Sequence, residues 1–259
     1  MKLPKSIIQK INNLTGKHFF LYCIIAIIIF GTCLRVIRTF ETTYLQRDEI
    51  LYLMMAESWD QNGFEIVYAK QYIPPMLLYL MRTFKPVFGT YVWAGRSINI
   101  ISGIFFILGI SYITLALFKS RKCAILAALL AAIHPYAVRL SGSCLREGWG
   151  LALIAVATAF IMYAIKRKSI LCWCGGGLAI GAASLFRYES LEFLLIVLIF
   201  WIVCIIKDKY EVLPAFKAFA LFSISIALMI FILSLIADIP LNYYTHNLFN
   251  YIVAKLQIF

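Results

Sequence analysis

The sequence predicts an all-α polytopic membrane protein in which residues 1–259 form a single transmembrane domain, with no separate soluble domain. Hydrophobic residues make up 63% of the chain and charged residues only 14%, whereas an average soluble domain carries about 25% charged residues. Several apolar stretches approach the roughly 20 residues that a helix needs to cross a membrane, and they lack the alternation of barrel strands. The composition therefore excludes a soluble globular domain.

Short basic clusters separate the apolar stretches. They are the N-terminal lysines and residues 119–122, 166–168 and 207–209. Because positively charged loops remain on the cytoplasmic side of a membrane, we expect all of these clusters, and the N-terminus, to be cytoplasmic. The same placement explains the net charge of +12 through membrane topology, so a nucleic acid partner is not expected.

About seven transmembrane helices follow from this arrangement. The first apolar stretch is longer than the apolar core of a signal peptide and lacks a small-residue cleavage site, so we interpret it as an uncleaved span. The predicted spans are residues 18–40, 92–118, 123–139, 147–165, 170–186, 189–206 and 215–237. Seven crossings place the C-terminal tail outside.

A long external loop, residues 41–91, holds six of the twelve acidic residues of the chain. Within it, the apolar residues that recur at helical spacing are Ile50, Leu51, Met54, Met55 and Trp59. This pattern predicts an interfacial helix over residues 48–60, with its acids and its tyrosine on other faces. A second helix is expected to begin at Pro74-Pro75, and it is too short and too charged to cross the membrane. We therefore expect two juxtamembrane helices on the outer surface.

Asp48 and Glu49 open the first of these juxtamembrane helices and are candidate catalytic residues. They fit a helix N-cap followed by a favourable first-turn acid. They also fit a general base or a metal-binding carboxylate at the mouth of a cavity, because a helix N-terminus keeps a carboxylate ionised. The two interpretations are compatible.

Further charged residues lie at the external ends of spans, where ionisable groups indicate a functional site. Arg146-Glu147 fits either a structural ion pair or a second acid beside a phosphate-binding arginine. Arg187-Tyr188-Glu189 fits either a helix cap or a contact to phosphate or acceptor. Arg35 and Arg96 are candidates for binding an anionic lipid headgroup or a phosphate. The three histidines show no zinc-ligand spacing, and no metal site is predicted from them.

Several motifs follow the first span in a fixed order. They are Arg47-Asp48-Glu49-Ile-Leu-Tyr52, Asn62-Gly63-Phe64, Pro74-Pro75-Met-Leu-Leu-Tyr79, Phe88-Gly89, Arg96, Leu145-Arg146-Glu147 and Phe186-Arg187-Tyr188-Glu189. In this order they resemble membrane glycosyltransferases of the GT-C superfamily, and in particular the protein O-mannosyltransferases and lipid A aminoarabinose transferases of the glycosyltransferase family 39 type. Ile73 stands where that family commonly carries a lysine. The chain also has fewer spans than those relatives, so we expect a C-terminally short form.

The resemblance implies sugar transfer from a polyprenyl-phosphate donor to a lipid or protein hydroxyl acceptor on the non-cytoplasmic face, with inversion. It implies that Asp48 is the general base and that Glu49 orients it or helps to bind a metal. Arg146 and Arg187 would hold the leaving phosphate, and Glu147 and Glu189 would contact the sugar or the acceptor. Arg96 and Tyr52 complete the expected substrate-binding set.

Other classes of function remain open from the sequence. A transporter or flippase for a lipid-linked or anionic substrate would also use charged residues at membrane depth. A noncatalytic membrane subunit would suit the short chain. A divalent metal is neither required nor excluded, and the compact loops and lysine-rich N-terminus favour a bacterial plasma membrane.

Overall fold

The computed structural model describes residues 5–63, 73–206 and 212–240, together with the single positions 243, 250 and 253. Within these ranges every regular element is helical, which confirms the predicted all-α fold. The basic cluster at residues 207–209 and most of the predicted external tail lie outside the described residues.

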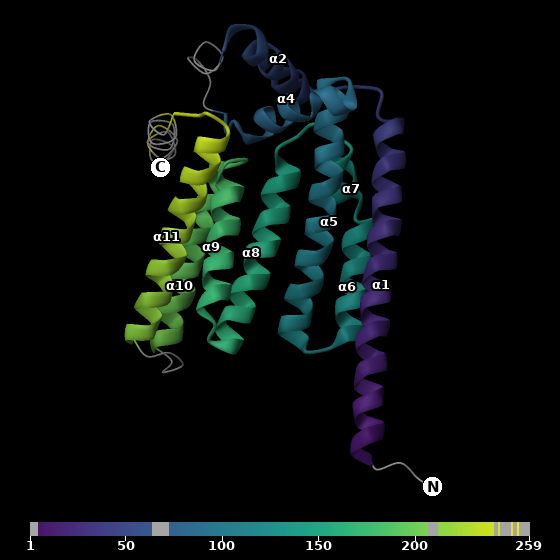
Figure 1. Cartoon of the computed structure of the whole chain (residues 1–259), viewed down its shortest axis with the longest axis vertical. Coiled ribbons are helices and arrows are strands. Elements are labelled where there is room, and N and C mark those ends of the chain that lie inside the picture. The colour runs from purple at the N-terminus through teal and green to yellow at the C-terminus, as the bar shows by residue number, and fades with distance from the viewer. Residues whose placement is uncertain are drawn as a thin grey trace.

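Two layers of helices make up the described structure (Figure 1). The long helices run side by side: α1 (Lys5–Glu41), α5 (Tyr91–Phe118), α6 (Arg121–Ile133), α8 (Glu147–Arg167), α9 (Ile170–Ser184), α10 (Phe193–Ile206) and α11 (Val212–Ile236). The shorter α2 (Arg47–Asn62) and α4 (Met76–Phe88) lie across one end of this bundle, with the short α7 (Pro135–Ser141) and the 3-10 helix η1 (Tyr188–Glu192) just beneath them.

Four of the described helical segments are long and apolar enough to cross a membrane. They are His18–Glu41, Tyr91–Phe118, Glu147–Arg167 and Phe216–Ile236, and the bent pair α6 and α7 makes a fifth if it is one span. Each of the seven predicted spans falls on one helix or on two consecutive helices, but α9 has 15 residues and α10 has 14, fewer than the roughly 20 that a full crossing needs. The count of seven therefore stays a prediction.

The predicted third span, residues 123–139, is not straight, because α6 and α7 meet at an angle of 57°. Pro135 begins α7 and has no backbone N–H, so it cannot continue the hydrogen-bond ladder of α6. The buried Arg35 of α1 takes up the carbonyl groups that this break exposes. Its guanidinium donates to the carbonyl oxygens of Ala131 (3.4 Å) and Ala132 (3.0 Å). The Arg35 side chain is thus engaged inside the bundle.

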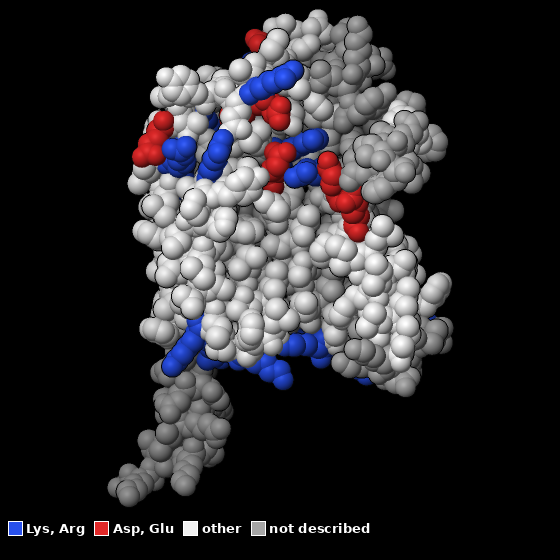
Figure 2. All heavy atoms as spheres, turned by 180° about the vertical axis from the view of Figure 1, so that it is seen from behind, with Lys and Arg blue, Asp and Glu red and all other residues white. Residues whose placement is uncertain are grey.

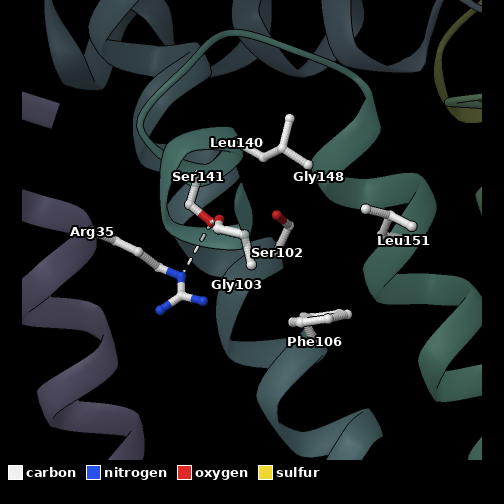
Figure 3. Close-up of a pocket in the computed structure, with 9 residues that line it drawn as sticks. Arg35, Ser102, Gly103, Phe106, Leu140, Ser141, Gly148 and Leu151 are labelled. Atoms are coloured by element: carbon white, nitrogen blue, oxygen red, sulfur yellow. Dashed lines mark hydrogen bonds between the residues drawn. The ribbon is translucent and has the colours of Figure 1, made fainter. Parts of the chain in front are cut away.

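Small residues make room for Arg35 among the helices. A side chain at Gly103 would collide with the guanidinium, and Arg35 Nε donates to Ser141 Oγ at 3.1 Å (Figure 3). Beside this pair lies a cavity of about 20 Å³, lined also by Ser102 and Gly148, which is large enough for one water molecule. The break in the third span is therefore stabilised by specific contacts of Arg35.

Helix α2 coincides with the predicted helix at residues 48–60, but its buried face differs in part from the predicted one. Ile50 and Met54 are exposed, whereas Tyr52, Met55 and Trp59 pack against Leu77, Leu78 and Met81 of α4 and its surroundings, with Glu49 also buried. The sequence pattern placed Glu49 and Tyr52 on other faces, because it counted only apolar side chains as candidates for burial. The structure corrects that assignment, and α4 begins at Met76, as the two prolines indicate.

A cluster of charges, Asp60, Arg82, Lys85 and Tyr91, joins α2, α4 and the start of α5. Asp60 accepts hydrogen bonds from Arg82 (2.6 Å) and from the Tyr91 hydroxyl, and Lys85 Nζ lies 3.9 Å from its carboxylate. Arg82 also lies over the ring of Trp59, 4.6 Å from its centre. These contacts fix the two cross-lying helices to the bundle.

Charge is distributed unevenly between the two ends of the molecule (Figure 2). The α5–α6 and α8–α9 loops and the helix ends beside them carry Lys119, Arg121, Lys122, Lys166, Arg167 and Lys168, at the end of the bundle opposite α2. At the opposite end, acidic and basic side chains are mixed around α2 and α4. We call the first of these ends the basic edge.

Candidate active site

Tyr52 of α2 packs in one buried cluster with Leu145 and Tyr188, the chain neighbours of Arg146 and Arg187. The charges of Arg146, Glu147, Asp48 and Arg187 all act on its hydroxyl group. Tyr52 is only 4% exposed, and burial raises its pKa to about 12. The phenol therefore stays protonated at neutral pH and can donate a hydrogen bond.

Asp48 lies one helical turn before Tyr52, on the same face of α2 and at the exposed rim of this site. It is in the first turn of the helix, where an acidic residue stabilises the helix end. An exposed carboxylate at the rim of the site can accept a proton from an incoming hydroxyl group.

Glu49, in contrast, is fully buried and engaged by the backbone. One carboxylate oxygen accepts from the Gln46 N–H at 2.8 Å, and the other accepts from the Cys144 N–H at 2.6 Å. The first bond caps α2, and the second ties α2 to the loop that precedes α8. Burial, reinforced by the charge of Glu49, raises the pKa of the Cys144 thiol to about 12, so this thiol is not a nucleophile at neutral pH.

Arg146 and Glu147 stand at the N-terminal end of α8, directly beneath α2. Leu145, next to them in the chain, packs in the same buried cluster as Tyr52. The hydrogen bond between Cys144 and Glu49, which are 95 positions apart, joins the same two segments. Arg146 Nε lies 3.9 Å from Glu147 Oε1, a separation that leaves both groups available for a ligand. The N-terminus of a helix adds partial positive charge at this point.

Arg187 reaches the same helix end from the turn between α9 and η1. Its Nε lies 3.5 Å from Glu189 Oε2, and its side chain runs over Gly150 in the first turn of α8. A Cβ at position 150 would lie 3.0 Å from the Cδ of Arg187, so glycine there leaves room for the guanidinium. Two arginines and two acids thus surround the start of α8.

Polar atoms without partners mark the interior of this site. Among the described residues, buried atoms without a hydrogen bond include Arg146 Nε, Glu147 Oε2, Trp149 Nε1 and Ser190 Oγ. Buried polar atoms are normally satisfied, and three of these atoms, on Arg146, Glu147 and Trp149, belong to the start of α8, which is typical of a site for a polar ligand. Trp149 and Ser190 were not predicted from the sequence, in which no charge or motif distinguishes them.

Arg96 lies apart from this group, on α5 and 5% exposed. Its Nη1 donates to the Thr39 carbonyl oxygen at 3.0 Å, which fixes the end of α1 to α5. Its charge acts on Cys144, on the far side of Glu49. The structure therefore places Arg96 behind the loop that supports the site.

The described residues contain no group of three or more His, Cys, Asp and Glu side chains close enough to hold a metal ion. Asp48 and Glu147 both lie near Tyr52, but no third ligand of these types joins them in that part of the chain.

The helical bundle and its apolar spans define an integral membrane protein, with a charged site at one end. Residues 73–245 match the family model of the dolichyl-phosphate-mannose-protein mannosyltransferases. Because the match covers more than half of the chain, the chain belongs to this family and is a membrane glycosyltransferase of the GT-C type. The match includes Arg146 and Arg187 and begins after Asp48 and Tyr52. No curated protein matches the chain.

Proposed function

We propose that this chain moves a sugar from a polyprenyl-phosphate donor to a hydroxyl group of a lipid or protein acceptor, with inversion at the anomeric carbon. The observation that carries the proposal is the packing of Tyr52 against Leu145 and Tyr188, which brings Asp48, the Arg146-Glu147 pair and Arg187 to the same end of the bundle. A carboxylate can act as general base for the acceptor, and guanidinium groups bind a departing phosphate.

In the proposed step, the acceptor oxygen attacks the anomeric carbon from the side opposite the phosphate. Its proton passes to the carboxylate of Asp48 as the bond from the anomeric carbon to the phosphate oxygen breaks. The electron pair of that bond stays on the phosphate, whose added charge is stabilised by Arg146, Arg187 and the start of α8. Glu147 and Glu189 accept hydrogen bonds from hydroxyl groups of the sugar or the acceptor.

Glu49 and Arg96 act as positioning residues in this proposal. Both oxygens of Glu49 are already occupied by backbone N–H groups, and Arg96 is bound to the end of α1. Through these contacts they fix the position of α2 relative to the loop before α8, and thereby keep Asp48 near Arg146. Neither side chain needs to touch the substrate.

The site faces the non-cytoplasmic side in this proposal, since the basic edge at the opposite end of the bundle fits the cytoplasmic side of a plasma membrane, which we take to be bacterial. A lipid-linked sugar on that side is reached through the membrane, and the mixed charges around α2 then lie at headgroup level. The donor and the acceptor are the expected partners, together with the surrounding lipids.

The test is transfer of radiolabelled sugar from polyprenyl-phosphate donors in membranes that contain this chain. Asp48→Asn removes the base and is expected to lower turnover by about 10²-fold or more. Glu57→Gln changes an exposed acid on the same helix and is expected to retain activity. Normal transfer by the Asp48 variant would contradict its role. No transfer by intact, inserted wild-type chain would favour a noncatalytic subunit or a transporter.

A further inference from the structure

A second site lies at the opposite end of the bundle from α2. Helices α5 and α8, with the first turn of α9, enclose an open apolar cavity of about 430 Å³, within the roughly 300–1,000 Å³ typical of ligand pockets. Its lining includes Phe105 and Tyr112 of α5, Phe160 and Tyr163 of α8, and Cys172 of α9. Phe105, Tyr112 and Phe160 are each at least 40% exposed, so the cavity opens toward the surrounding lipid.

The cavity has one charged residue in its lining, Arg167, and that residue stands at its outer end. Arg167 is exposed at the basic edge and lies over the ring of Tyr163, 5.4 Å from its centre. The described residues show no acid within ion-pair distance of Arg167. Its charge is therefore available to an anion from the membrane surface.

The length of the cavity matches one leaflet of a bilayer. Along α8 it extends from Val156 to Arg167, which is about 16 Å at 1.5 Å per residue. Half of a hydrocarbon core of roughly 30 Å is about 15 Å. Its inner end is at mid-membrane depth and its outer end is at headgroup level, where the rings of Tyr112 and Tyr163 meet, 6.3 Å apart. Tyrosine is enriched at this level of membrane proteins.

We propose that this cavity is a binding site for a phospholipid with an anionic headgroup, taken from the leaflet at the basic edge. One acyl chain lies between α5 and α8 and reaches Phe105. The phosphate lies at Arg167, within reach of the hydroxyl groups of Tyr112 and Tyr163, and the neighbouring Lys166 and Lys168 add attraction to the headgroup. The charge complementarity at one end and the apolar lining along the rest select this occupant.

Lipid binding is independent of sugar transfer, because the donor phosphate of the proposed reaction lies at the other end of α8. Phe105 connects the two regions, since its ring packs on Trp149 with centres 5.8 Å apart. An acyl chain that fills the cavity therefore contacts a ring that packs against Trp149 of the candidate active site.

The experiment measures how many anionic phospholipid molecules remain on the purified chain, by native mass spectrometry after washing in detergent. It is repeated after adding back phosphatidylglycerol or phosphatidylcholine. We expect wild-type chain to retain and rebind phosphatidylglycerol in preference to phosphatidylcholine. Arg167→Gln should bind it about fivefold more weakly, as expected for the loss of about 1 kcal/mol of attraction from one surface cation. Arg167→Lys should restore most of the binding.

Two controls separate this site from general attraction to a basic surface. Lys122→Gln removes a charge from the same edge but outside the cavity, and it should leave retention unchanged. A phosphatidylglycerol with six-carbon chains should bind much more weakly than the full-length lipid. Equal loss in the Lys122 and Arg167 variants, unchanged retention after Arg167→Gln, or equal binding of the short-chain lipid would overturn the proposal.

Discussion

Two neighbouring acids, Asp48 and Glu49, occupy opposite environments on α2. Asp48 is exposed at the rim of the site, and Glu49 is fully buried with both oxygens bound to backbone N–H groups. Their adjacency in sequence suggested a shared catalytic role. The contacts instead favour a division in which Asp48 acts on the substrate and Glu49 holds the first turn of α2 against the loop before α8.

Glu49→Gln is expected to lower the free energy of unfolding by about 1–3 kcal/mol, because an amide offers only one acceptor oxygen and leaves one buried N–H without a partner. Asp48→Asn should leave stability nearly unchanged, since the side chain is exposed. Thermal unfolding of the two variants in the same detergent makes the comparison. Equal stability of both variants would mean that the Glu49 contacts do not anchor α2.

At the scale of elements, the cluster of Asp60, Arg82, Lys85 and Tyr91 attaches α2 and α4 to the bundle. Partial burial would by itself raise the pKa of Asp60, but hydrogen bonds from Tyr91 and Arg82 and the nearby cations outweigh it, so that the pKa lies below its usual value. The ionised carboxylate is therefore the form that the folded arrangement stabilises.

The lowered pKa of Asp60 predicts how the attachment of α2 and α4 to the bundle responds to acid. A carboxyl group with a lowered folded-state pKa contributes stability above its unfolded pKa of about 4, and the contribution is lost as pH falls through the lower folded-state value. Wild-type chain should be more stable than Asp60→Asn at neutral pH, and the difference should narrow below about pH 4. Melting temperatures of both proteins across pH 3 to 7 test this. A difference that stays constant with pH would contradict it.

For the whole molecule, the sequence predicted the class of fold and the family well and the internal contacts poorly. Long apolar stretches predict the spans, because an apolar helix is stable in lipid. Basic clusters predict how the spans are oriented, because positively charged loops stay on the cytoplasmic side. The contact of Glu49 with Cys144 links positions 95 apart, and no periodic pattern encodes it. The buried acid on α2, the bend at Pro135 and the unsatisfied Trp149 and Ser190 depend on tertiary packing, so they became visible only in three dimensions.

The orientation of the bundle can be tested with single cysteines in a background that is otherwise free of cysteine. Cys123 is exposed at the basic edge, and Thr43→Cys would lie in the loop that leads to α2 at the other end. If the basic edge is cytoplasmic, a membrane-impermeant maleimide should label position 43 in intact cells. It should label Cys123 only in inverted vesicles. The opposite pattern would place the candidate site inside.

Arg35 also bears on how the protein is assembled. Isolated in the membrane, α1 would carry a guanidinium bound only to the Gly31 carbonyl oxygen, and a helix ending at Ile133 would carry free carbonyl groups, each unfavourable in hydrocarbon. The two segments satisfy one another through the bonds from Arg35 to Ala131 and Ala132. The first span should therefore be retained beside the insertion machinery until the third has been synthesised, so that these spans leave it as one unit.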